Sequence, residues 1–139
     1  MRQTPASFAA LFALCAMPAA AQVPPEPGKP VVVEATLSGQ PIRAAQGDVR
    51  YTITQGVIPA GGGVPSHRHP YPRLVNVLAG RLKVTNLDTG QVRELKAGDW
   101  LVDAVDQWHE TAVVGNEPVR LLTIDQAPPG AVVTIPRNP

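Results

Sequence analysis

The residues with the clearest chemical potential in this sequence of 139 residues are its three histidines, His67, His69 and His109. Residues two apart in an extended segment project from the same face, so the side chains of His67 and His69 can reach one point. Neutral imidazole is a common ligand of first-row transition metals, and three protein ligands leave positions open for water or substrate. The histidines therefore predict a site for one divalent metal ion, although a lone His-x-His pair is also typical of exposed loops.

The elements that must position these histidines are predicted to be β-strands. Short apolar runs rich in valine, isoleucine and threonine recur from Val31 onward, separated by turn residues, and no stretch repeats apolar residues at helical spacing. Many short strands at close spacing indicate an antiparallel sandwich or barrel. The expected strands are Val31–Leu37, Val49–Ile58, Leu74–Leu78, Leu82–Leu87, Val92–Leu95, Trp100–Ala104, Glu110–Val114, Val119–Asp125 and Val132–Ile135.

Glycines and an arginine stand at fixed distances from the first two histidines. Gly61 is followed by five residues, His67-x-His69, three residues, Arg73, six residues and Gly80. This array has the spacing of the first sequence motif of the cupin superfamily, with Arg73 at the position where most members carry a glutamate.

A second array surrounds the third histidine. Gly98 is followed by five residues, Ala104-x-Asp106, two residues and His109, which is the spacing of the second cupin motif without its usual proline and second glycine. The chain thus resembles cupins from about Gly47 to Asp125. The resemblance implies an all-β fold, a double-stranded β-helix or jelly-roll barrel. It also implies that the three histidines match three of the four usual metal ligands.

Arg73 is the main departure from the family pattern. Arginine stays protonated and has no acceptor lone pair, so it cannot ligate a cation. Any site is then a three-histidine site, as in some thiol and diketone dioxygenases of this superfamily, or it recruits a ligand from elsewhere. A guanidinium beside the metal would favour an anionic substrate. The alternative is that Arg73 turns outward, or pairs with an acid such as Glu110, and serves stability alone.

Other residues near the histidines have two interpretations each. Asp106 and Gln107 could orient the imidazole of His109, or they could simply form the preceding turn. Tyr71 and Trp108 could line the mouth of a pocket, or they could pack in the core or an interface.

The first 21 residues predict a secretory signal peptide. Arg2 is followed by a continuous apolar run and then by small residues up to Ala21, and the run is shorter than the ~20 residues of a membrane span. Cys15 lies within this segment, so the mature chain would contain no cysteine thiolate. We expect a periplasmic protein without a membrane segment, made of a proline-rich tether over residues 22–30 and one barrel domain over residues 31–139.

The net charge of +1 gives no basic excess of the kind that nucleic-acid-binding proteins carry, so we do not expect a nucleic-acid partner. The predicted function is that of a metal-dependent enzyme, dioxygenase-like or lyase/isomerase-like, acting on a small and possibly anionic molecule. Iron is the first expected ion, with manganese, copper, nickel or zinc as alternatives. The other possibilities are a non-catalytic periplasmic protein that binds a metal or small ligand, and a structural barrel in which Arg73 replaces the metal's charge. The resemblance also allows a homodimer, because cupins commonly form dimers and the apolar Leu74 and Leu78 would lie on the outer face.

Overall fold

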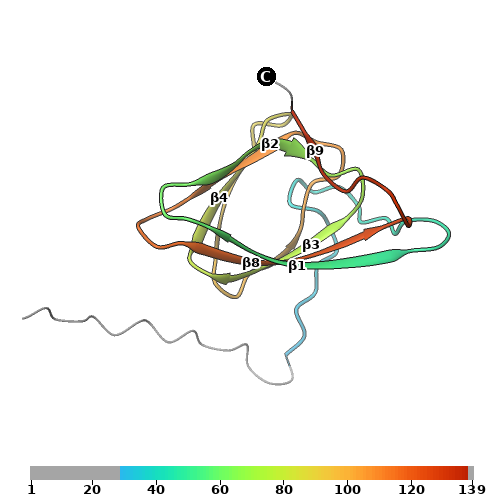
Figure 1. The fold of residues 1–139 in the computed structure, drawn as a ribbon, viewed down its shortest axis with the longest axis horizontal. Coiled ribbons are helices and arrows are strands. Elements are labelled where there is room, and N and C mark those ends of the chain that lie inside the picture. The colour runs from blue at the N-terminus through green and yellow to red at the C-terminus, as the bar shows by residue number, and fades with distance from the viewer. Residues whose placement is uncertain (1–28, 138–139) are drawn as a thin grey trace, which may run out of the picture.

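The computed structural model describes residues 29–137, and within this range it contains nine β-strands and no helix (Figure 1). The expected signal peptide and nearly all of the tether lie outside the described residues. No helix in the described range is long and apolar enough to cross a membrane. The strands are β1 (Arg50–Ile58), β2 (Gly63–Arg68), β3 (Arg73–Ala79), β4 (Arg81–Asn86), β5 (Val92–Lys96), β6 (Trp100–Val102), β7 (His109–Val113), β8 (Val119–Ala127) and β9 (Ile135–Pro136).

The strands form two antiparallel sheets that face each other across the interior (Figure 1). One sheet has the order β1-β8-β3-β6 and the other has the order β5-β4-β7-β2-β9, so neighbours within a sheet are often distant in the sequence. This arrangement is the predicted double-stranded β-helix, and it confirms the all-β class.

The apolar core lies between the two sheets. It is formed by Ile58, Val77, Leu82, Val84 and Val119, all buried. Strands that face the core on one side and solvent on the other alternate in burial, as β4 does along its length. The three histidines are buried as well, and His67 and His109 line a cavity together with Leu82 and Val84 of this core.

The prediction of a strand at Val31–Leu37 was wrong. The segment makes only an isolated bridge between Ala35 and Pro41, because the chain reverses direction between Thr36 and Gln40. The amide of Thr36 donates to the carbonyl of Gln40 at 2.8 Å, and the side chain of Thr36 accepts from the Gln40 amide at 3.0 Å. The turn at its end leaves this segment without a regular strand partner, despite the β-propensity of its valines.

Strand β2 was missed because its start was taken as part of a glycine-rich and proline-rich loop. It pairs with β7 at Gly63 and Val64 and again at His67, with a bulge of one extra residue between these points. Pro65 lies in the bulge, where its missing N–H group does not break a regular ladder. The bulge also changes the alternation, so that Val64 and His67, three residues apart, both line the interior.

Candidate metal centre

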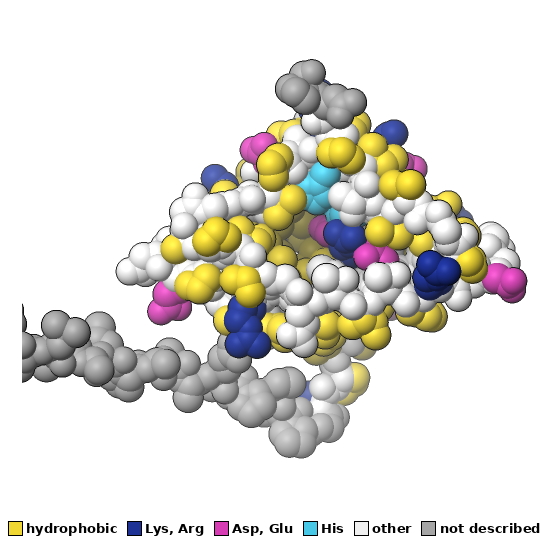
Figure 2. Space-filling model, viewed as in Figure 1, with side chains coloured by type: hydrophobic (Ala, Val, Ile, Leu, Met, Phe, Trp, Pro, Cys, Tyr) yellow, Lys and Arg dark blue, Asp and Glu magenta, His cyan; other side chains and the backbone are white. Residues whose placement is uncertain are grey.

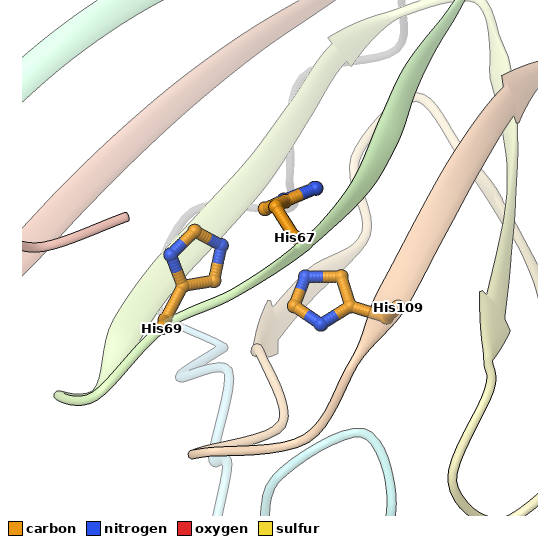
Figure 3. A group of neighbouring side chains, drawn as sticks. All are labelled: His67, His69 and His109. Atoms are coloured by element: carbon orange, nitrogen blue, oxygen red, sulfur yellow. The ribbon is translucent and has the colours of Figure 1, made fainter. Parts of the chain in front are cut away.

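The three predicted histidines meet inside the barrel. His67 lies directly opposite His109 in the pairing of β2 with β7, and His69 follows the end of β2 (Figure 3). One ring nitrogen from each residue lies within 4.8 Å of the others, and the ring centroids are 4.4–5.1 Å apart. The residues are 7, 0 and 2 % exposed respectively. The structure thus brings together side chains that a single ion could join.

Each imidazole is oriented by a backbone carbonyl. The Nδ1 atoms of His67, His69 and His109 lie 2.7, 2.8 and 2.9 Å from the carbonyl oxygens of Pro65, Val133 and Gln107. Only an N–H group can bond to a carbonyl oxygen, so in each neutral ring Nδ1 carries the proton and Nε2 carries the lone pair. This is the usual support of a metal-binding histidine.

The Nε2 of His109 is a buried polar atom with no hydrogen-bond partner within the described part of the chain. Leaving such an atom unpaired costs about 1–3 kcal/mol. A metal ion bound to this lone pair would remove the cost. The histidines therefore fit a divalent metal in their number, their spacing and their tautomers.

Burial keeps two of these imidazoles neutral. Desolvation lowers the pKa of His67, and it lowers the pKa of His69 to about 3, with repulsion from Arg73 as the second cause. A protonated imidazole has no free lone pair, so both shifts maintain the form that binds metal at neutral pH.

Arg73 points into the interior, so the alternative that it turns outward is wrong, whereas the alternative that it forms an ion pair with an acid is confirmed. Its Nε and Nη2 atoms donate to the two carboxylate oxygens of Asp125 at 2.7 and 3.0 Å, and Nη2 also donates to Thr134 Oγ1 at 3.0 Å. The partner is thus Asp125, whereas Glu110 lies exposed on β7. Asp125 therefore occupies the Nε–Nη2 edge of the guanidinium, which could otherwise pair with a substrate carboxylate. The third nitrogen, Nη1, lies 3.4 Å from His69 Nε2.

Sequence reasoning missed a second acid at this site. Asp103, just after β6, places Oδ2 at 3.7 Å from His69 Nε2. Burial raises the pKa of its carboxyl group. The sequence feature that could have indicated this role is a charged residue within the apolar run Trp100–Ala104, because charged residues are rarely buried in a strand without a partner.

The residues expected around His109 have separate roles. The backbone of Gln107 orients His109, and its side-chain oxygen accepts from Asn86 Nδ2 at 2.7 Å. Asp106 has a φ of 55° and lies 3.9 Å from Arg68, so it is a turn residue facing away from the histidines. Trp108 packs under the guanidinium of Arg68 at 5.0 Å from the ring centroid.

A small cavity of about 90 Å³ lies beside the histidines. Its polar lining comes from His67, His109, Arg73 and Asp103 together with two threonines, and the rest is apolar. Figure 2 shows the hollow between the sheets, with histidine next to basic and acidic side chains. Neither Tyr71 nor Trp108 lines this cavity.

A larger groove of about 670 Å³ lies elsewhere, on the outer face of the sheet β1-β8-β3-β6. It is mainly apolar and includes Tyr51, Leu74 and Trp100. None of the histidines lines it, so its size does not bear on the metal chemistry.

Comparison with known proteins identifies the family. The model of the cupin domain matches residues 54–125, which is more than half of the chain, so the protein belongs to the cupin family. No curated protein sequence matches the chain significantly.

Solved structures share the fold at low sequence identity. An uncharacterized protein with a double-stranded β-helix domain from Klebsiella pneumoniae has a TM-score of 0.52 at 22% identity, over 70% of this chain and 91% of that one. The polyketide cyclase RemF from Streptomyces resistomycificus has a TM-score of 0.54 at 18% identity, over 67% and 65%. The DMSP lyase DddQ from Ruegeria pomeroyi has a TM-score of 0.54 at 21% identity, over 62% and 42%. The chain spans less than two thirds of the cyclase and of the lyase, and these similarities show the fold alone.

Proposed function

We propose that this protein is an exported cupin that binds one divalent transition metal through His67, His69 and His109 and uses it in catalysis. The observation that carries the proposal is the convergence of three buried imidazoles, each with its Nδ1–H bonded to a backbone carbonyl. Carbonyl support of this kind fixes the tautomer and orientation of metal-binding histidines and leaves Nε2 of each ring as an acceptor.

The surroundings of the histidines support a small substrate. A cavity of about 90 Å³ is well below the roughly 300–1,000 Å³ typical of sites for drug-sized ligands. The metal would supply Lewis acidity or oxygen activation in a dioxygenase-like or lyase/isomerase-like reaction. The apolar walls would exclude water, and the positive charge of Arg73, partly neutralised by Asp125, would favour an anionic group.

Metal analysis of untagged protein tests the binding step. We expect close to one equivalent of ion after metal-free protein is reloaded separately with iron, manganese, copper, nickel and zinc, with iron the first candidate for the native ion. Triple replacement of the histidines by glutamine should abolish binding. A wild-type protein that retains no ion would refute the proposal.

Turnover requires a separate test. The iron-loaded protein should consume oxygen or convert substrate with some member of a panel of small thiols, diketones, phenols and carboxylic acids. A loaded protein that binds small anions without converting them would instead favour the second candidate, a non-catalytic periplasmic metal or small-ligand binding protein. The small volume of the cavity supports this candidate, because it leaves little room for two reacting molecules.

The assembly and location are also proposals. The apolar outer groove with Leu74 supports a homodimer through the sheet β1-β8-β3-β6, and light scattering after size-exclusion chromatography would measure its mass. Export to the periplasm is tested by cell fractionation, together with mass spectrometry of the mature N-terminus, which we expect at Gln22.

A further inference from the structure

Three charged side chains form a row across the inner face of one sheet. In the pairing of β3 with β8, Arg73 lies opposite Asp125. In the pairing of β3 with β6, Leu74 lies opposite Val102, so the next pair is Arg73 with Asp103, whose amide donates to the carbonyl of Arg73 at 2.9 Å. Directly opposed residues share a face. Arg73 thus has one aspartate on each side.

The arginine is not shared equally between the two acids. Its Nε and Nη2 atoms both bond to Asp125, which holds the guanidinium on that side. None of the described residues donates a hydrogen bond to the carboxylate of Asp103. Among the residues that the structure describes, its only ion-pair contact is with His69 Nε2, 3.7 Å from Oδ2.

This contact joins two acceptors. The proton of the His69 ring is on Nδ1, where it bonds to the carbonyl of Val133, so a nitrogen lone pair faces a carboxylate oxygen. A cation between the two atoms would turn this unfavourable contact into a favourable one. Neighbouring ligands at about 2.1 Å from a metal lie roughly 3.0–3.4 Å apart, close to the separation seen here. Arg73 Nη1 makes only a long hydrogen bond to the same nitrogen, at 3.4 Å, and a metal ion bound to that lone pair would displace it.

We propose that Asp103 is a fourth protein ligand of the metal, supplied from the strand next to the one that carries Arg73. The site would then still consist of three imidazoles and one carboxylate. The carboxylate would come from Asp103 instead of the usual glutamate, whose position is held by Arg73 in its pair with Asp125. Two aspartates also balance part of the charge of the metal and the arginine in the buried interior. The inference rests on the proposed metal site, and it adds a ligand that the sequence motifs do not contain.

Titration with cobalt(II) tests the assignment, because the ligand-field bands of cobalt respond to the number and type of ligands. The affinity and visible spectrum of the wild-type protein are compared with those of Asp103→Asn, which keeps the shape of the side chain, and of Glu110→Gln. The latter is the matched control, since it removes an acid next to His109 in sequence that lies exposed on β7. Far-ultraviolet circular dichroism and a melting curve establish that each variant is folded.

We expect Asp103→Asn to weaken cobalt binding by at least about tenfold, the lower end of the loss seen for residues that merely support a ligand, and to shift the cobalt bands. Glu110→Gln should leave both unchanged. Weaker binding by Asp103→Asn with unchanged cobalt bands would show that the charge of Asp103 acts from a distance, and it would overturn the assignment. Unchanged cobalt affinity in this variant would overturn it as well. Failure of the wild-type protein to bind any ion would instead refute the metal site itself, together with the ligand assigned to it.

Discussion

Acidification of the metal-free protein should destabilise it through His69. The pKa of this histidine is lowered from 6.5 to about 3 in the folded state. Between these values the unfolded chain binds a proton that the folded protein does not, so stability is fully present above pH 6.5 and falls as the pH approaches 3. One pKa unit corresponds to about 1.36 kcal/mol. At pH 5, 1.5 units below the unfolded value, His69 alone should cost about 2 kcal/mol.

Two neighbours modify the size of this effect. The pKa of His67 is also lowered by burial, so it adds to the loss. The pKa of Asp103 is raised by burial, so its folded form takes up a proton before the unfolded form does and becomes more stable as the pH falls. The effect of His69 is therefore measured most cleanly in an Asp103→Asn background.

The assay is urea unfolding of metal-free protein at several pH values from 7.5 to 5. In the Asp103→Asn background, stability should fall by about 2 kcal/mol or more, given the contribution of His69. Adding His69→Gln should reduce the fall by about that amount, because glutamine does not titrate. The reasoning is refuted if the two proteins show the same dependence on pH. Saturating metal should shift the whole transition to higher urea, since only the folded state offers the assembled site.

Three further substitutions probe the interior. Asp125→Ala should destabilise the protein by about 3–5 kcal/mol in urea unfolding, because it leaves the buried Arg73 unpaired, and a loss below about 1 kcal/mol would contradict the importance of the pair. Arg73→Gln should tighten cobalt binding by on the order of tenfold, or about 1.4 kcal/mol, because it removes a positive charge 3.4 Å from His69 Nε2; equal or weaker binding in a chelator competition would show that Arg73 does not oppose the metal. Gly63→Ala should cost roughly 1–3 kcal/mol, because a Cβ there would overlap the Thr111 carbonyl oxygen, and an unchanged melting temperature would show that β2 can move away from β7 at no cost.

The fold class and the three histidines could be read from the sequence because their signals are local. Alternating valines and regularly placed turns indicate strands, and the spacing around His67, His69 and His109 resembles the cupin motifs. Gly80 illustrates the physical basis of one motif position. Its φ is 77°, and a Cβ there would lie 2.6 Å from the carbonyl oxygen of Pro118, so the turn between β3 and β4 requires glycine.

Local patterns could not predict the strand ends near the histidines. Periodicity placed Gly63–Pro65 in a loop, whereas the pairing with β7 and the bulge make this segment part of β2. A bulge is stabilised by contacts with the neighbouring strand, which no short window of sequence contains.

The sequence by itself determined that His67, His69 and His109 can bind a metal and that Arg73 cannot. Only the tertiary structure decided the neighbours of Arg73, because register between strands distant in the chain places Asp125 on one side and Asp103 on the other. Those partners lie 52 and 30 residues away, positions that strand alternation can assign to a face but not to a contact. The sequence left three roles open for Arg73, namely orienting substrate, facing solvent or pairing with an acid, and the register identified Asp125 as its buried partner. It also placed the carboxylate of Asp103 beside the histidines.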